Sequence, residues 1–456
     1  MKIFWIFVFF TVSLLNWSCS SIITNQEFYT PVIMDLKQGN YSSASKFIQY
    51  AETQELYADK DRLLLFLDKG ITLHYSGDYE KSNNAFHKAE YLMDSLYTKS
   101  ISKGIASFLI NDNALDYSGE VYEDLYINIF KVLNYIHLDQ FNEAYVEVQK
   151  ISDKLKEQNV YYQEAIAELN KSEDAKVKIE ASDLDFYNDA LANYLSHLIY
   201  RAEGEADNSR ISLEKASEAW ETYPSVYNYE IPSALSNTTI GQEALLNVIA
   251  FTGNAPFKQP IGARITTFED WISISDPTEY YITPIPFPGM EGGWNFKFEF
   301  PEIYEEGTSV HDIEVYVDNE YLGSLELLEN IANVATKTFE VRKNMIFFKT
   351  AIRAITKGIA AGSGGKAIKK EVKNEGLGDI LAFALNLAVD ATEHADLRSW
   401  QTIPGYSFTG EFPISPGKYD LEIRFIGPNE EVLKVHPIKN FEANNKLNIV
   451  ESHYLD

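Results

Sequence analysis

Residues that could carry out catalysis or bind a metal are few in this sequence and widely spaced. The densest group surrounds His394, which has Glu393, Asp396 and Arg398 as neighbours. Such a group could transfer protons, but charged residues grouped in this way far more often form ion pairs at the end of a helix, and we expect that role here. The other histidines show no pair at the spacing that places two metal ligands on one helix face, so we expect no metal site. They stand at positions 74, 87, 137, 197, 311, 436 and 453.

A glycine-rich segment at 361–367, Ala-Gly-Ser-Gly-Gly-Lys-Ala, has the composition of a phosphate-binding loop. Such a loop needs glycine where Ala360 stands and a hydroxyl residue where Ala367 stands, because the hydroxyl binds Mg²⁺. It also follows a strand, whereas this segment follows a predicted helix. The sequence contains no Gly-x-Ser-x-Gly or His-Glu-x-x-His motif either. We therefore expect no nucleotide, no cofactor, no catalytic residues and no enzymatic activity.

The amino-acid composition limits the classes of molecule that this protein could bind. The 456 residues include 39 Lys and Arg against 67 Asp and Glu, which gives a formal net charge of −28. Nucleic acid is excluded as a partner, because phosphate binding needs a positive face. A hydrophobic content of 45% and a charged content of 23% are typical of globular proteins, and the length predicts two or three domains.

The first eighteen residues have the layout of a cleaved signal peptide. Lys2 precedes the mostly apolar run 3–15, which is too short to span a bilayer. Cys19, the only cysteine of the chain, follows this run between two serines. The placement is similar to that of the lipidated cysteine of bacterial lipoproteins, and we expect a signal peptide at 1–18 and lipidation of Cys19. The alternative is an ordinary leader with a chance cysteine.

Residues 19–223 predict a helical repeat array. Four segments share one order of residue types: a residue at the corner between two helices, then an aromatic or small residue, then further small or apolar residues. This order resembles the tetratricopeptide pattern. One helical hairpin cannot bury its apolar side alone, so such copies stack and form a concave groove that binds peptides, although a bare spacer remains the alternative. The copies are Gly39, Tyr41, Ala44, Ile48 and Ala51; Gly70, Gly77, Tyr79, Phe86 and Ala89; Asp139, Phe141, Ala144, Val148 and Ile151; and Gly204, Ala206, Ser209, Leu213 and Ala216.

Residues 224–456 predict a β-rich domain. Alternation of apolar and polar residues indicates strands within about 240–330 and 401–456, and we expect an antiparallel, sandwich-like arrangement. A helical pair is predicted as an insertion at about 342–398. The expected fold is therefore α+β and multidomain: an all-α array followed by a β-sandwich-like domain with an inserted helical pair.

The start of this insertion is strongly basic, with nine basic residues and one acidic residue in 342–373. Three alternatives stay open: the basic helix contacts acidic surface of the same chain, an acidic partner, or anionic lipid headgroups. The candidate contact residues are Lys349, Arg353, Lys357, Lys366, Lys369 and Lys370.

Two further segments carry a resemblance to a known group of proteins. The first runs from Asn111-Asp112 to Asn128, and the second from Ala395 to Pro404. Both are similar to uncharacterised bacterial envelope lipoproteins that combine tetratricopeptide-like helices with a C-terminal β region. The resemblance implies an accessory protein of the cell envelope, most simply at the outer membrane facing the periplasm, and supplies no catalytic role. Both segments are candidate interaction surfaces, or mere connections between elements. Their candidate residues are Asn111, Asp112, Tyr117, Gly119, Glu120, Tyr122, Glu123, Asn128, Asp396, Arg398 and Trp400.

Two functional hypotheses follow. The first is a non-enzymatic, lipid-anchored envelope protein that acts as a scaffold for other envelope proteins or peptides. The alternative is a lipoprotein for glycan binding or uptake at the cell surface, suggested by an aromatic content of 14%.

Overall fold

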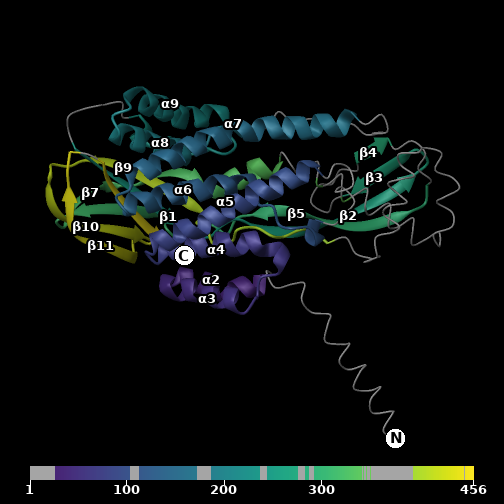
Figure 1. Cartoon of the computed structure of the whole chain (residues 1–456), viewed down its shortest axis with the longest axis horizontal. Coiled ribbons are helices and arrows are strands. Elements are labelled where there is room, and N and C mark those ends of the chain that lie inside the picture. Colours follow the sequence, from purple (N-terminus) through teal and green to yellow (C-terminus); the bar gives the residue numbers. More distant parts are fainter. Residues whose placement is uncertain are drawn as a thin grey trace, which may run out of the picture.

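The computed structural model of the chain combines helices in its first half with β-sheets in its second (Figure 1). It describes residues 26–102, 112–171, 186–236, 244–275, 283–286, 292–340, 394–445 and 447–456, with positions 343, 346 and 350. Four predictions lie outside these residues: the leader with Cys19, the candidate residue Asn111, the glycine-rich segment 361–367, and the basic contact residues. Those basic residues are Lys349, Arg353, Lys357, Lys366, Lys369 and Lys370.

The helices of the first half pack as consecutive pairs, as the sequence predicts. Each pair is joined by three residues. The pairs are α2 (Gln26–Lys37) with α3 (Tyr41–Thr53), α4 (Arg62–Tyr75) with α5 (Tyr79–Ser102), α6 (Val121–His137) with α7 (Phe141–Lys171), and α8 (Ala190–Ala202) with α9 (Ala206–Thr222). None of the helices in the described part of the chain is long and apolar enough to cross a bilayer.

The corner between the two helices of a pair has the same geometry four times. Gly39, Gly77, Asp139 and Gly204 each adopt a positive φ between 55° and 81°. In every corner the next residue donates its backbone N–H to the carbonyl five residues back, as Asp78 does to Leu73 at 2.9 Å. This is the Schellman motif, which satisfies the last carbonyls of a helix and turns the chain. The predicted corners are confirmed.

The other repeated residues pack the two helices of each pair together. Phe86 is fully buried, and a Cβ atom added at Gly70 would lie 2.4 Å from its ring, so only glycine allows this approach. Ala44, Ala144 and Ala216 are likewise fully buried. The small residues therefore bring paired helices close together.

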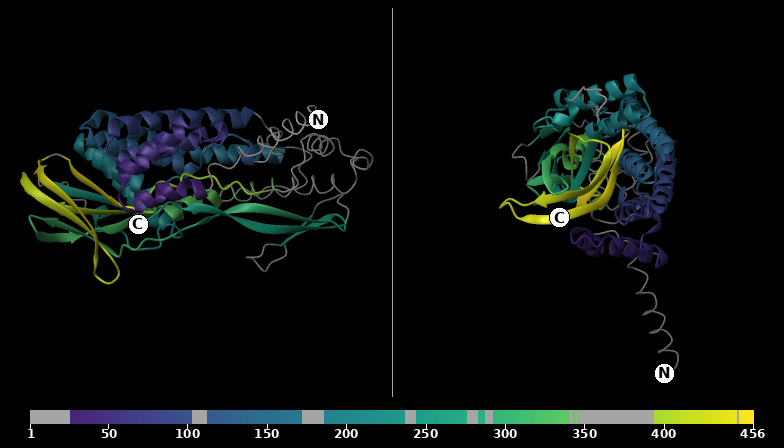
Figure 2. Two further views of the ribbon diagram at one scale, coloured as in Figure 1. Left: turned by 90° about the horizontal axis from the view of Figure 1, so that it is seen from below. Right: turned by 90° about the vertical axis from the view of Figure 1, so that its left-hand side faces the viewer.

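Three four-stranded sheets form the second half. The first has the order β12 (Asn448–Tyr454), β1 (Leu245–Thr252), β9 (Tyr406–Pro413), β8 (Glu326–Asn330). The second has the order β11 (Val432–Ala443), β10 (Gly417–Ile426), β6 (Asp312–Val317), β7 (Glu320–Ser324). The third has the order β4 (Thr283–Pro286), β3 (Trp271–Ser275), β2 (Phe257–Phe268), β5 (Asn295–Tyr304), and extends away from the other two (Figure 2).

The prediction of purely antiparallel strands is wrong at one place. β1 and β12 pair in parallel, with Leu246 opposite Asn448 and Thr252 opposite Tyr454. Parallel neighbours need a long connection rather than a hairpin, and here most of the second half lies between the two strands. Every other recorded strand pair is antiparallel.

β1 is buried on both of its faces. Leu246, Val248 and Ala250 contact residues of the second sheet, while Ile249 and Phe251 contact the helices. A continuous apolar strand is typical of a position between two layers. The order of layers is therefore helices, first sheet, second sheet (Figure 2).

One buried core crosses the domain boundary predicted at 223/224. It contains side chains of every helix pair together with Phe251, Leu328, Trp400 and Leu455. The first helices of three pairs, α4, α6 and α8, are buried along most of their length because C-terminal segments cover them. A helix at 331–340 contributes further residues to this core.

The predicted helical insertion at 342–398 falls mostly outside the described residues, but its end is not helical. Residues 394–400 have no helical structure. The backbone N–H of Arg398 donates to the Asp396 carboxylate at 3.1 Å, and such local side-chain bonds compete with the helix. The expected ion-paired helix end around His394 is therefore wrong.

Candidate functional site

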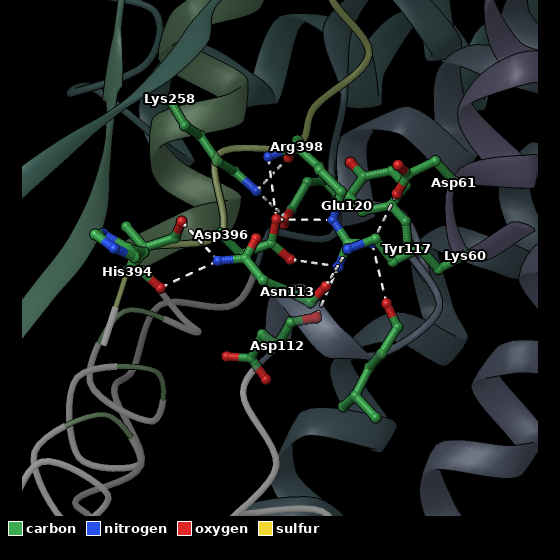
Figure 3. Close-up of polar contacts among 12 residues, drawn as sticks. Lys60, Asp61, Asp112, Asn113, Tyr117, Glu120, Lys258, His394, Asp396 and Arg398 are labelled. Atoms are coloured by element: carbon green, nitrogen blue, oxygen red, sulfur yellow. Dashed lines mark hydrogen bonds and ion pairs between the residues drawn. The ribbon is translucent and has the colours of Figure 1, made fainter. Parts of the chain in front are cut away.

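The two segments that the sequence singles out meet each other. Arg398 lies against the helical half, where it contacts Asp61 and the loop at 112–120 (Figure 3). Trp400 contacts Glu123 at the start of α6. We call this group the central polar cluster. Its members are Asp61, Asp112, Tyr117, Glu120, Glu123, Lys258, Asp396, Arg398 and Trp400.

Arg398 is the centre of the cluster. Its Nε and Nη2 donate to both oxygens of Asp396 at 2.8 and 2.7 Å. Its Nη1 donates to Asp61 at 2.9 Å and to the carbonyl of Leu115 at 3.0 Å, and Nη2 donates to the carbonyl of Asp112 at 2.8 Å. A guanidinium has five N–H donors, so all five are used. The guanidinium also lies 5.3 Å from the centre of the Tyr117 ring.

The charges around Arg398 stabilise one another. Burial alone would raise the pKa of Asp396, but the hydrogen bonds and charge of Arg398 outweigh it and lower that pKa. Burial opposes the charged form of Arg398 in the same way, yet Asp396 and Asp61 raise its pKa. Arg398 is therefore a permanent cation here.

A second ion pair ties the third sheet into the cluster. Lys258 on β2 contacts Glu120 at 2.5 Å and donates to the carbonyl of Arg398 at 2.9 Å. Both side chains are at most 7% exposed. Removing one partner of such a buried pair leaves a buried unpaired charge, so β2, the loop before α6 and the 394–402 segment depend on one another.

Glu123 connects α6 to Trp400. It forms a capping box with Glu120, and its carboxylate accepts hydrogen bonds from the Tyr117 hydroxyl and from the backbone N–H of Trp400 at 2.7 Å. Burial raises its pKa to about 7, and the charge of Glu120 adds to this effect. The Trp400 ring packs edge-on against Phe86 and Phe130.

Asp68 on α4 lies at a second contact that the sequence reasoning missed. Its carboxylate accepts hydrogen bonds from Tyr29 and Tyr57 at 2.8 Å each and from Thr402 at 2.7 Å. Burial raises its pKa to about 6 although the three bonds lower it. The available signal was an acidic residue within the apolar run 63–73 of the sequence.

A carboxyl pair joins α8 to β8, and it too was missed. The Glu329 carboxylate accepts hydrogen bonds from Tyr126 and from Tyr227, the latter at 3.1 Å. Asp189, which caps α8 through the backbone N–H of Ala192, is its neighbour. Burial raises the pKa of both carboxyl groups, and the charge of Glu329 raises that of Asp189 further. Burial therefore favours the protonated form of both carboxyl groups.

Most of the described candidate residues in the two segments are buried. Tyr117, Tyr122, Glu123 and Trp400 are at most 4% exposed, and Asn128 is fully buried against Glu90 and Glu147. Three of the candidate residues, Asp112, Gly119 and Asp396, are partly exposed. Gly119 adopts a φ of 83°. The buried side chains, among them Tyr117, Glu123 and Trp400, pack the two segments against each other and against α6.

Both ends of the predicted basic insertion contact β5. Lys343 lies 3.6 Å from Glu302, and His394 lies 3.0 Å from Glu299. Among the described residues, no group of three or more His, Cys, Asp or Glu side chains is arranged to hold a metal ion.

The central polar cluster fastens separate segments of the chain together. Arg398 and Lys258 contact carboxylates and carbonyls of the same chain, and the carboxylates of Asp61, Glu120, Glu123 and Asp396 contact N–H or O–H donors. Comparison of the chain with protein-family models, curated proteins and solved structures finds no match.

Proposed function

We propose that this chain is a non-enzymatic envelope lipoprotein that is anchored through Cys19 and acts as a scaffold for other envelope proteins. In this proposal it faces the periplasm from the outer membrane. The lone cysteine behind an apolar leader supports the anchor, and acyl chains hold a protein to a membrane through the burial of their methylene groups.

Two finer assignments of fold belong to this proposal. The four identical corners support a tetratricopeptide-like array. The core shared by β1, β6, β10 and β12 supports a two-sheet sandwich. An array of this kind offers binding surfaces along its length.

One observation carries the scaffold proposal: C-terminal segments of the chain cover the helices α4, α6 and α8. Thr402 donates a hydrogen bond to Asp68 on α4, Phe251 on β1 contacts Phe130 on α6, and Glu329 on β8 accepts a hydrogen bond from the backbone N–H of Leu191 on α8. A peptide partner therefore does not bind along these helices, and partners must use outer surfaces. Such surfaces carry Tyr50 on α3 and Tyr91 on α5, which are 56% and 74% exposed.

Partner binding is tested by photo-crosslinking in the cell that makes the protein. A crosslinking amino acid replaces Tyr50 or Tyr91 on the helices, or Tyr321 on β7, which is 57% exposed. We expect a defined protein adduct from at least one helical position, identified by mass spectrometry. The buried position Phe130 is the control and gives none. Adducts from none of the exposed positions would contradict the scaffold role.

The anchor is tested separately. Labelled palmitate is expected to enter the intact protein and to be lost in Cys19→Ser. Protease treatment of whole cells then separates the periplasmic scaffold, which stays protected, from the cell-surface glycan-binding alternative, in which the protein is cleaved.

A further inference from the structure

Four of the eight histidines gather where the helices meet the C-terminal strands, a group that we call the histidine junction. Glu451 on β12 binds two of them: one oxygen lies 2.7 Å from Nε2 of His74 on α4, and the other lies 2.8 Å from Nε2 of His137 at the end of α6. Nδ1 of His74 contacts the amide oxygen of Asn134 at 2.8 Å. One carboxylate therefore fastens β12 to two helices.

The other two histidines lie on the strands themselves. His436 on β11 contacts the Ser452 hydroxyl at 2.9 Å. His453 packs between Tyr41 and Tyr75, and its Nδ1 is buried without a hydrogen-bond partner in the described part of the chain. A protonated imidazole at His453 would therefore have an unsatisfied, buried N–H.

Lys434 on β11 adds a positive charge to the strand side. Its Nζ donates to the Tyr41 hydroxyl at 2.9 Å and to the carbonyl of His453 at 3.4 Å, and it lies over the Tyr41 and Tyr454 rings. The groups that face Glu451 from neighbouring elements are thus His74, His137, Tyr75 and Tyr79 on the helices and Lys434, His436 and His453 on the strands.

The two sides of the junction respond to pH in opposite ways. Burial opposes the charged form of His74, but Glu451 outweighs it and raises the pKa of that imidazole. Burial lowers the pKa of His453 to about 3 and, with the charge of Lys434, lowers that of His436. The contribution of His74 to the stability of the junction is present at low pH, and it is lost as the pH rises above the raised pKa of this imidazole. The His436 and His453 contributions are present above about pH 6.5 and are lost as the pH falls.

We propose that the histidine junction is a pH-sensitive latch, which holds β11 and β12 on α3, α4 and α6 most tightly near pH 6.5 and releases them in acid. In acid, protons on His436 and His453 place two more cations beside Lys434 and His74, while Glu451 offers a single negative charge. The proposal does not depend on the scaffold function.

The test is hydrogen exchange of the β12 amides in the full chain, followed by mass spectrometry and corrected for the intrinsic effect of pH. Protection is expected to be highest near pH 6.5 and to fall at least about tenfold by pH 5. In the His436→Gln, His453→Gln double variant the fall from pH 6.5 to pH 5 should disappear. His311→Gln, outside the junction, is the control and should keep the wild-type profile.

Two results would overturn the latch: wild-type protection that is flat between pH 5 and pH 6.5, or a double variant that keeps the full acid loss. If the double variant does not fold, the single His436→Gln variant, whose side chain is only partly buried, must show a smaller acid loss than the wild type. A loss equal to that of the wild type contradicts the proposal.

Discussion

Arg398 places all five of its N–H groups on partners, which come from the neighbouring Asp396 and from two distant stretches of sequence. Asp61 and Arg398 are 337 residues apart in the chain. Guanidinium geometry fits this task, because its planar fork matches carboxylates and carbonyls in fixed directions, whereas lysine offers a single point charge. The chemistry of one side chain therefore determines how the 394–402 segment sits against the helices.

Replacing Arg398 tests this role. Arg398→Ala leaves Asp61 and Asp396 as buried carboxylates without their cation, so we expect a loss of about 3–5 kcal/mol in the free energy of unfolding, measured by urea titration. The control is Arg210→Ala on α9, whose ion pair with Glu214 is more than half exposed on both side chains and should change stability little. Equal losses from both variants would contradict the central role of Arg398.

Glu123 gives the protein a stability that depends on pH. Its pKa rises from an ordinary 4.5 to about 7 in the folded chain, so its contribution is complete below about pH 4.5 and is lost as the pH rises through 7. We expect wild-type stability to fall between pH 6 and pH 8, and Glu123→Gln to reduce this slope. Calorimetric melting at both pH values measures it, with Glu214→Gln on an exposed face of α9 as the control. An unchanged slope in Glu123→Gln would show that Glu123 does not titrate there.

At the scale of elements, all four corners between paired helices contain a residue with a positive φ, which is glycine in three of them and Asp139 in the fourth. Gly77 has a φ of +81° and open space where a Cβ would lie, whereas Asp139 adopts a φ of +55° with a side chain attached. Gly77→Ala should therefore destabilise the protein by ~1–2 kcal/mol, and Asp139→Gly should leave it unchanged or stabilise it by up to ~1 kcal/mol. Urea unfolding of both variants is the measurement, and changes of the same sign would contradict the shared corner geometry.

The corners could be predicted from the sequence because their cause is local. At Gly77 and Asp139, the corner residue follows an apolar helical run and precedes an aromatic residue. The whole signal lies within about ten positions of the corner. The same holds for the hairpin β6–β7, where alternation and the Asp318-Asn319 turn stand together. In each case the physical reason lies within one stretch of chain.

The central polar cluster and the parallel pairing of β1 with β12 could not be predicted in this way. Arg398 and Trp400 were noticed as residues, but their partners Asp61, Glu123 and Phe86 lie about 280–340 positions away. No local period encodes such a contact. Asp68 shows the same difficulty, because a carboxylate on an apolar helix face has meaning only once Tyr29, Tyr57 and Thr402 surround it.

At the scale of the whole molecule, the shared core makes the two halves depend on each other. Helices on one side and the second sheet on the other both pack on β1. Among the described residues, side chains of both halves belong to one buried core, so we expect the two halves to unfold together. Removing the helices would expose Ile249, Phe251, Leu328 and Trp400 to water.

Fragments therefore should not fold. We expect residues 224–456 expressed alone to aggregate or stay unfolded, because burial of a large apolar side chain contributes about 1.5–3 kcal/mol and many are exposed together. In the full chain, helical circular dichroism and tryptophan fluorescence should report one coincident urea transition. A sharp, native-like transition in the fragment, or two separate transitions in the full chain, would show independent domains.

The place of β12 has a consequence for how the protein is made. This strand lies beside β1 across more than two hundred residues of sequence, and its Glu451 reaches α4 and α6. The ribosome must therefore have synthesised almost the entire chain before β1 can find its parallel neighbour and the helices their last contacts. Until residue 454 has been synthesised, the nascent chain lacks these contacts, and part of the apolar surface of its core stays exposed.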